Sequence, residues 1–253
     1  MFTYSVTRRA KTVQQPHDGY LPLSRFAHHT LEDGFCLKAA ENIPASIMGQ
    51  TVDYMSRLVA GVDDPESAFR ISLFGAILAG RPQRGTELLS QIHGLDDASL
   101  GAACKLSSYD AYFRSPNMKA VHPVEPEPNH DTLFNIRLMI TRMVRFLSEY
   151  GPVIKSGFTM EGGYTDIVSS GDGDFLTEDT LWDVKTSKFP PKSSDTLQVL
   201  MYYIMGKHSW NESFQKIQSI GIVNPRLNSI WTIDAAQVPH SVIEEVERHV
   251  IGY

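Results

Sequence analysis

Cysteine, long apolar runs and excess positive charge are all scarce in this chain of 253 residues. Cys36 and Cys104 are far apart and have no Cys-x-x-Cys spacing, which excludes a disulfide-stapled fold and predicts reduced thiols. The longest apolar runs fall short of the roughly 20 residues that span a bilayer, and the N-terminus lacks the apolar segment of a signal peptide. We therefore expect a cytoplasmic protein with no membrane partner.

The charge balance and the missing motifs narrow the function further. A net charge of -6 argues against a surface that attracts nucleic acid everywhere, although it leaves room for a local basic groove. The chain has no Gly-x-x-x-x-Gly-Lys loop, so ATP-driven translocation is not expected. It also has no Gly-x-Ser-x-Gly elbow or Cys-His signature, which disfavours acyl-transfer hydrolysis.

The overall composition is that of an ordinary globular protein, with 42% hydrophobic and 21% charged residues. In the first half, apolar residues recur every three or four positions, which predicts helices. These helical segments are 46–61, 64–80, 84–94 and 96–113.

Four prolines lie between Pro116 and Pro128, and such a segment cannot continue a helix. We predict a mainly helical N-terminal subdomain over residues 1–115, a proline-rich linker over 116–130 and a second domain over 131–253.

The second domain has a mixed helix and strand pattern. A helix is predicted directly after the linker, followed by three short β-like runs, a second helix, a strand pair and a closing helix. The β-like runs are 152–160, 164–171 and 180–187. The intervening residues Asp172–Asp174 are predicted to form a polar hairpin turn, since Leu176 and Thr177 do not fit a calcium-binding loop. The order up to the first strand of the pair is α-β-β-β-α-β, which predicts an α/β fold with a mixed sheet flanked by helices.

One β-like run, "LWDVKTSK", contains two opposite charges in an otherwise apolar context. Alternate side chains of a strand point to the same face, so Asp183 and Lys185 project together while Trp182 and Val184 project to the other side. Two opposite charges on one face of a core strand suggest a functional site.

The second domain resembles the PD-(D/E)XK nuclease superfamily, especially its RecB-like branch, over roughly residues 130–235. The family has an aspartate late in its second strand, an acid-x-lysine in its third strand and Gln-x-x-x-Tyr on the next helix. The corresponding residues here are Asp166, Asp183 with Lys185, and Gln198 with Tyr202. The resemblance implies a restriction-endonuclease-like core that hydrolyses phosphodiester bonds of DNA, leaving 5′-phosphate and 3′-hydroxyl ends.

The resemblance also implies a role for each residue. Asp166, Asp183 and the backbone carbonyl of Val184 would bind Mg²⁺ or Mn²⁺, hard cations that prefer oxygen ligands. Lys185 would orient or deprotonate the attacking water, or stabilise developing charge. Gln198 and Tyr202, four residues apart, would share one helix face at the border of the site.

Some alternatives stay open. Family members often have a Glu or His on the first helix as a further ligand; here Glu149, Glu161 or a residue of the N-terminal half would have to supply it. A catalytically inactive member that binds nucleic acid or protein is the main alternative. A glycosidase acid and base pair is disfavoured, because Lys185 should lower the pKa of both carboxyl groups. The expected partner is nucleic acid, DNA rather than RNA, and a homodimer or larger complex is left open.

Overall fold

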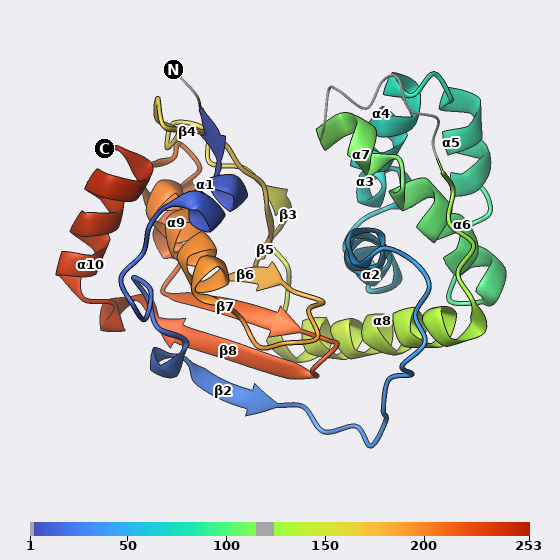
Figure 1. Ribbon diagram of the computed structural model, residues 1–253, viewed down its shortest axis with the longest axis horizontal. Helices are drawn as coiled ribbons and strands as arrows, with labels where there is room; N and C mark the ends of the chain where they lie inside the picture. The colour runs from blue at the N-terminus through green and yellow to red at the C-terminus, as the bar shows by residue number, and fades with distance from the viewer. Residues whose placement is uncertain (1–2, 115–123) are drawn as a thin grey trace. The chain divides into compact units, whose positions relative to one another are not determined.

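The computed structural model describes residues 3–114 and 124–253, which divide into two compact units (Figure 1). The first, here called the sheet unit, contains residues 1–32 and 150–253; the second, the helical unit, contains residues 33–149. This division differs from the predicted boundaries at 115 and 131. Part of the predicted linker falls on residues 115–123, which lie outside the described residues.

The sheet unit is built on a six-stranded sheet whose strand order is β2-β8-β7-β6-β5-β3. The strands are β2 (Ala27–Thr30), β3 (Lys155–Phe158), β5 (Gly173–Leu176), β6 (Thr180–Val184), β7 (Ser219–Asn224) and β8 (Ser229–Asp234). Neighbours β6 and β7 are parallel, and all other neighbouring strands of this sheet are antiparallel. Helices flank the sheet, so the predicted α/β class is confirmed (Figure 1).

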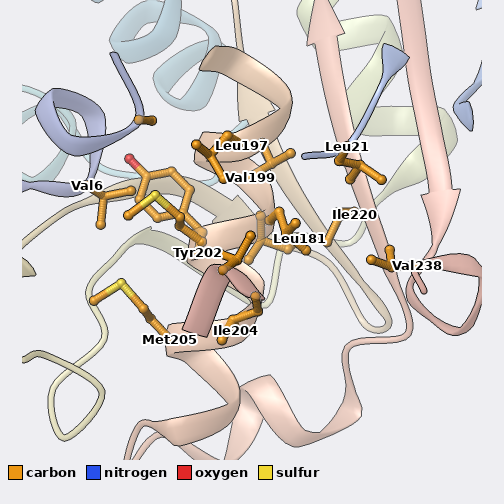
Figure 2. Close-up of a cluster of buried hydrophobic side chains, with 14 of the residues drawn as sticks. Val6, Leu21, Leu181, Leu197, Val199, Tyr202, Ile204, Met205, Ile220 and Val238 are labelled. Atoms are coloured by element: carbon orange, nitrogen blue, oxygen red, sulfur yellow. The ribbon is translucent and has the colours of Figure 1, made fainter. Parts of the chain in front are cut away.

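Helix α9 (Ser193–His208) connects β6 to β7 and packs on one face of the sheet (Figure 1). Figure 2 shows Leu197 and Ile204 of α9 near Leu181 of β6 and Ile220 of β7, all of them buried in one hydrophobic cluster. Each such side chain stabilises the fold by about 1.5–3 kcal/mol when it is fully buried. The cluster therefore fixes α9 against the two central strands.

Residues from the N-terminus complete the sheet unit. β1 (Tyr4–Ser5) pairs with β4 (Val168–Ser170) in a small second sheet, α1 (Val6–Thr12) packs against α9, and β2 pairs with β8 at the edge of the large sheet. The sequence pattern did not reveal this, because all four residues of β2 are exposed and none alternates with a buried apolar neighbour. Helix α10 (His240–Glu245) and the π-helical turn Val246–Ile251 close the unit.

The predicted strand assignment is wrong in one segment. The run 164–171 was expected to be the second of the three successive strands, but it provides only β4, which pairs with β1 and lies outside the large sheet. Its expected place is taken by β5, which pairs with β3 on one side and β6 on the other. The predicted hairpin turn at Asp172–Asp174 is therefore also wrong, since Gly173 and Asp174 begin β5.

The helical unit has helices over all four first-half segments predicted to be helical. Two of the predicted helices correspond to α2 (Ala45–Val59) and α5 (Pro82–Leu89). The other two are each divided, 64–80 into α3 (Pro65–Ala68) and α4 (Arg70–Leu78) and 96–113 into α6 (Asp97–Ser107) and α7 (Asp110–Arg114). The unit also contains α8 (His130–Tyr150), the helix predicted to open the second domain. Asp64 and Asp96 cap α3 and α6 by accepting hydrogen bonds from the backbone N–H groups of Ser67 and Ser99. No helix in the described part of the chain is both long and apolar enough to cross a membrane.

Polar contacts of α8 explain why this helix belongs to the helical unit. The guanidinium of Arg142 is paired with Asp33 at 2.6 Å, and the side-chain amide of Asn135 donates to the carbonyl of Lys38 at 2.8 Å. Arg137 donates to Asp97 at the start of α6. These partners all lie between residues 33 and 149, so α8 is held by the helical unit rather than opening the sheet unit.

Candidate active site

Strand β6 contains the charged residues that the sequence singled out. Leu181 packs into the hydrophobic cluster under α9, so strand alternation directs Asp183 to the same face. The N–H of Lys185 donates to the carbonyl of Val223 in β7 at 2.9 Å, which continues the ladder one residue beyond β6. Lys185 Nζ lies 2.8 Å from Asp183 Oδ2, so the two side chains share one face.

The charges around Lys185 keep it protonated. Its side chain is 22% exposed, whereas that of Asp183 is only 3% exposed. Burial acts to lower the pKa of Lys185, but the carboxylates of Asp183, Asp195 and Asp174 together outweigh burial and raise that pKa. Lys185 is therefore an ammonium ion at neutral pH.

Gln198 of α9 connects the charged pair to Tyr202. Its Nε2 donates to Asp183 Oδ1 at 3.2 Å and to the Tyr202 hydroxyl at 2.9 Å. Its Oε1 accepts a hydrogen bond from Lys185 Nζ at 3.1 Å. Gln198 and Tyr202 share one face of the helix because they are four residues apart. The structure therefore brings these four predicted site residues into direct contact.

Tyr202 is a neutral hydrogen-bond donor at this site. The side chain is almost fully buried, and its hydroxyl donates to the carbonyl of Asp172 at 2.6 Å. Burial raises the pKa of the phenol well above its ordinary value, and the nearby carboxylates of Asp183, Asp174 and Asp172 raise it further. Tyr202 therefore ties α9 to the segment that precedes β5.

Asp174 is a carboxylate of this site that the sequence analysis missed. Strands β5 and β6 pair in antiparallel register with Phe175 opposite Trp182, and extending this register by one residue sets Asp174 opposite Asp183. Directly opposed residues on one face of a sheet have Cβ atoms only about 4.5–5.5 Å apart. Asp174 Oδ2 also accepts a hydrogen bond from the N–H of Val184 at 2.6 Å.

Asp166, the predicted first metal ligand, is not brought to the site. It is exposed on a bend just before β4, and β4 pairs with β1 rather than with a strand of the large sheet. A usable signal was present in the sequence. The segments "GDFL" and "TLWD" are separated by only three residues, a length typical of a β-hairpin, and a hairpin there pairs Asp174 with Asp183.

The side chains on β5 and β6 fit a hard divalent cation. Mg²⁺ usually takes one or two protein carboxylates and completes its shell with water and substrate oxygens. Asp174 and Asp183, opposed across two paired strands, provide two such carboxylates. Val184 directly follows Asp183 and donates its N–H to Asp174; its carbonyl was the third predicted ligand.

A third acidic or imidazole ligand was expected but is not evident. Among residues 3–114 and 124–253, no group of three or more His, Cys, Asp and Glu side chains is arranged to hold a metal ion. Of the two named candidates, Glu149 is paired with Arg145 at 2.8 Å and Glu161 accepts a hydrogen bond from Thr159 at 2.8 Å. Any cation at this site would therefore depend on two carboxylates.

Comparison with known proteins gives no relative for this site. No protein-family model matches the chain, and neither a curated protein nor a solved structure matches it significantly.

Proposed function

We propose that this protein is a metal-dependent nuclease of the PD-(D/E)XK type that hydrolyses phosphodiester bonds of DNA. The observation that carries the proposal is one connected cluster, here called the polar network, which joins β5, β6 and α9. Its members are Asp174, Asp183, Lys185, Gln198 and Tyr202. Except for Asp174, these are the residues that the resemblance identified from sequence.

The order of elements supports the same family. In the sheet unit the chain passes through β3, β5 and β6, then through α9 to β7, which lies parallel to β6. These elements follow the β-β-β-α-β part of the order that the resemblance implies, whereas the helix before them, α8, belongs to the helical unit. The difference from the sequence-based prediction is that β5, rather than the run 164–171, is the second strand.

The chemistry assigns a role to each side chain. A divalent cation held by Asp174 and Asp183 would neutralise phosphate charge and lower the pKa of a bound water. Lys185 is an ammonium beside these carboxylates when no cation is bound, and in that form it would stabilise charge on a phosphate oxygen. Gln198 holds Asp183 and Lys185 in fixed orientations through its two hydrogen bonds.

Cleavage of linear and circular DNA with Mn²⁺ tests this proposal. The wild-type protein should cut DNA, and both chelation of the metal and the substitution Asp183→Asn should abolish cutting. Asp179→Asn is the matched control, because Asp179 is an exposed residue just before the other end of β6. Cleavage that persists unchanged in Asp183→Asn would refute the assignment.

A non-catalytic binding module is the second candidate, and one observation favours it. Asp183 Oδ2 is ion-paired with Lys185 at 2.8 Å and Oδ1 accepts a hydrogen bond from Gln198, so the protein itself already balances the charge of this carboxylate. Calorimetric titration with Mn²⁺ separates the two candidates. A nuclease should bind the ion, and Asp174→Asn and Asp183→Asn should each weaken that binding; a binding module should show no such dependence.

A further inference from the structure

The loop formed by residues 186–192 begins next to the polar network and ends in contact with Asp195. It directly follows Lys185, the residue paired with Asp183. At its far end the N–H of Lys192 donates to Asp195 Oδ2 at 2.8 Å, and Asp195 is one of the carboxylates that raise the pKa of Lys185. Any side chain presented by this loop therefore lies close to the proposed catalytic residues.

Residues of the β7–β8 hairpin hold this loop in place. The carbonyl of Ser187 accepts a hydrogen bond from Asn224 Nδ2 at 2.9 Å, and the carbonyl of Thr186 accepts one from Arg226 Nε at 2.6 Å. Asn224 is completely buried, so this attachment does not depend on a mobile surface group. The loop is therefore fixed to the sheet although it is neither helix nor strand.

Phe189 projects from this fixed loop into solvent. Its side chain is 67% exposed, although its N–H is bonded to Ser187 Oγ at 3.0 Å. Pro190 and Pro191 follow it, and consecutive prolines restrict the backbone on that side. The exposure of Phe189 is thus a property of a constrained backbone, not of a frayed segment.

Two exposed lysines flank this aromatic ring in sequence, Lys188 directly before it and Lys192 three residues after it. Proteins bind single-stranded nucleic acid by combining positively charged side chains along the phosphate backbone with exposed aromatic rings. In such binding sites the lysines attract phosphates, and the aromatic ring stacks on a base.

We propose that Phe189 stacks on an unpaired base of the substrate within a few nucleotides of the scissile phosphate, while Lys188 and Lys192 contact the adjoining phosphates. This inference rests on the proposed nuclease function and names the form of its substrate: single-stranded DNA or a frayed duplex end. Bases within an intact duplex are already stacked on their neighbours and do not offer a free face.

The reach of the chain sets where the stacked base lies. Phe189 is four residues beyond Lys185, and an extended chain spans at most about 3.6 Å per residue, so their backbones are within roughly 14 Å. Nucleotides along one strand of a duplex advance by about 3.4 Å each, and more when the strand is stretched. The stacked base is therefore within about four nucleotides of the phosphate that is cut.

Binding measured without cleavage tests this inference. Fluorescence anisotropy in chelator and low salt would compare an oligothymidylate of about 16 nucleotides, the upper end of single-strand site sizes, with a blunt duplex. Phe189→Leu should weaken binding of the single strand by roughly 5- to 150-fold, the factor produced by losing one base stack, and Phe189→Trp should retain it. Lys188→Ala and Lys192→Ala should each reduce the slope of log affinity against log salt by about 0.7.

Trp210→Leu is the matched control, because Trp210 is 82% exposed but follows the opposite end of α9. It should bind the single strand as the wild type does. The inference is overturned if Phe189→Leu binds the single strand like the wild type, or if it loses duplex binding by the same factor.

The failure of this inference and that of the proposed function have different signatures. Cleavage and binding that are both unaffected by Phe189→Leu would leave the nuclease intact and overturn only the stacking role. Binding that depends on Phe189 in a protein that cuts no DNA would uphold the stacking role and refute catalysis. A wild-type protein that neither binds nor cuts DNA would overturn both.

Discussion

The ammonium of Lys185 donates a hydrogen bond to the side-chain oxygen of Gln198, at 3.1 Å. A lysine can only donate and a carboxylate can only accept, so this contact leaves the amide nitrogen of Gln198 to face Asp183. One glutamine on α9 thereby aligns the anion of Asp183 in β6 and the cation of Lys185 just after that strand. The polar network is arranged around this residue.

Gln198→Leu should therefore reduce activity without unfolding the protein. The substitution keeps the size of the side chain but removes the hydrogen bonds that orient Asp183 and Lys185. Loss of such a supporting group typically costs about 10- to 100-fold in activity or metal affinity. Rates of DNA cleavage and Mn²⁺ titration would measure the effect, with circular dichroism as a check on folding. Gln218→Leu, at an exposed position before β7, should leave all three unchanged.

The two candidate upstream aspartates can be separated directly. Asp174→Asn should lower Mn²⁺-dependent cleavage by at least about 100-fold, because a metal ligand contributes several kcal/mol and each 1.36 kcal/mol is a factor of ten. Asp166→Asn should have no effect on cleavage, since Asp166 is exposed near a different sheet. If instead Asp166→Asn is the inactive variant, the site has been assigned to the wrong strand.

The ion pair of Lys185 predicts a loss of stability at high pH. Folding raises the pKa of Lys185 above the usual lysine value, so the pair stabilises fully below about pH 10.4 and the stabilisation is lost as the pH rises through the folded value. Lys185→Arg keeps its charge there, because a guanidinium has a pKa above about 12. Its free energy of unfolding, from urea titration, should fall less steeply than that of the wild type as the pH rises above about 10.4.

Lys188→Arg is the control for replacing a lysine by an arginine, because this exposed lysine lies three residues further along the same chain segment. Its stability should follow the wild-type curve. Parallel curves for the wild type and Lys185→Arg would show that the pair contributes nothing to this pH dependence.

Gly173 should not tolerate a larger residue. A Cβ atom there would lie 2.0 Å from Cζ of Phe158, which is fully buried opposite Gly173 in the neighbouring strand β3. Gly173→Ala should therefore destabilise the protein by about 1–3 kcal/mol and displace Asp174 next to it. Urea unfolding and cleavage rates would both report the change.

Gly101→Ala provides the comparison for that substitution. Apart from its chain neighbours and the backbone of its own helix, no atom lies within 4 Å of a Cβ built at Gly101, which is inside helix α6. Replacing a helical glycine by alanine should stabilise the protein by up to about 1 kcal/mol. Equal effects at the two glycines would contradict the close packing of Phe158 on Gly173.

Local sequence pattern was sufficient for several parts of the site. The alternation of a strand put Asp183 and Lys185 on one face, and the period of a helix put Gln198 and Tyr202 on one face; their side-chain contacts are consistent with both. The helices of the first half also followed from their apolar period. These features depend on residues a few positions apart, whose relative directions the backbone geometry sets by itself.

Sequence alone determined which strand carries the acid-x-lysine pair, which helix carries the glutamine and tyrosine, and the α/β class. Only the tertiary structure decided that Asp174 rather than Asp166 faces Asp183, and that the exposed strand β2 and the helix α1 complete the sheet unit. The physical reason is that membership of a sheet depends on hydrogen bonds between distant segments. Two segments with similar local patterns, such as those of β4 and β5, can therefore pair with entirely different partners.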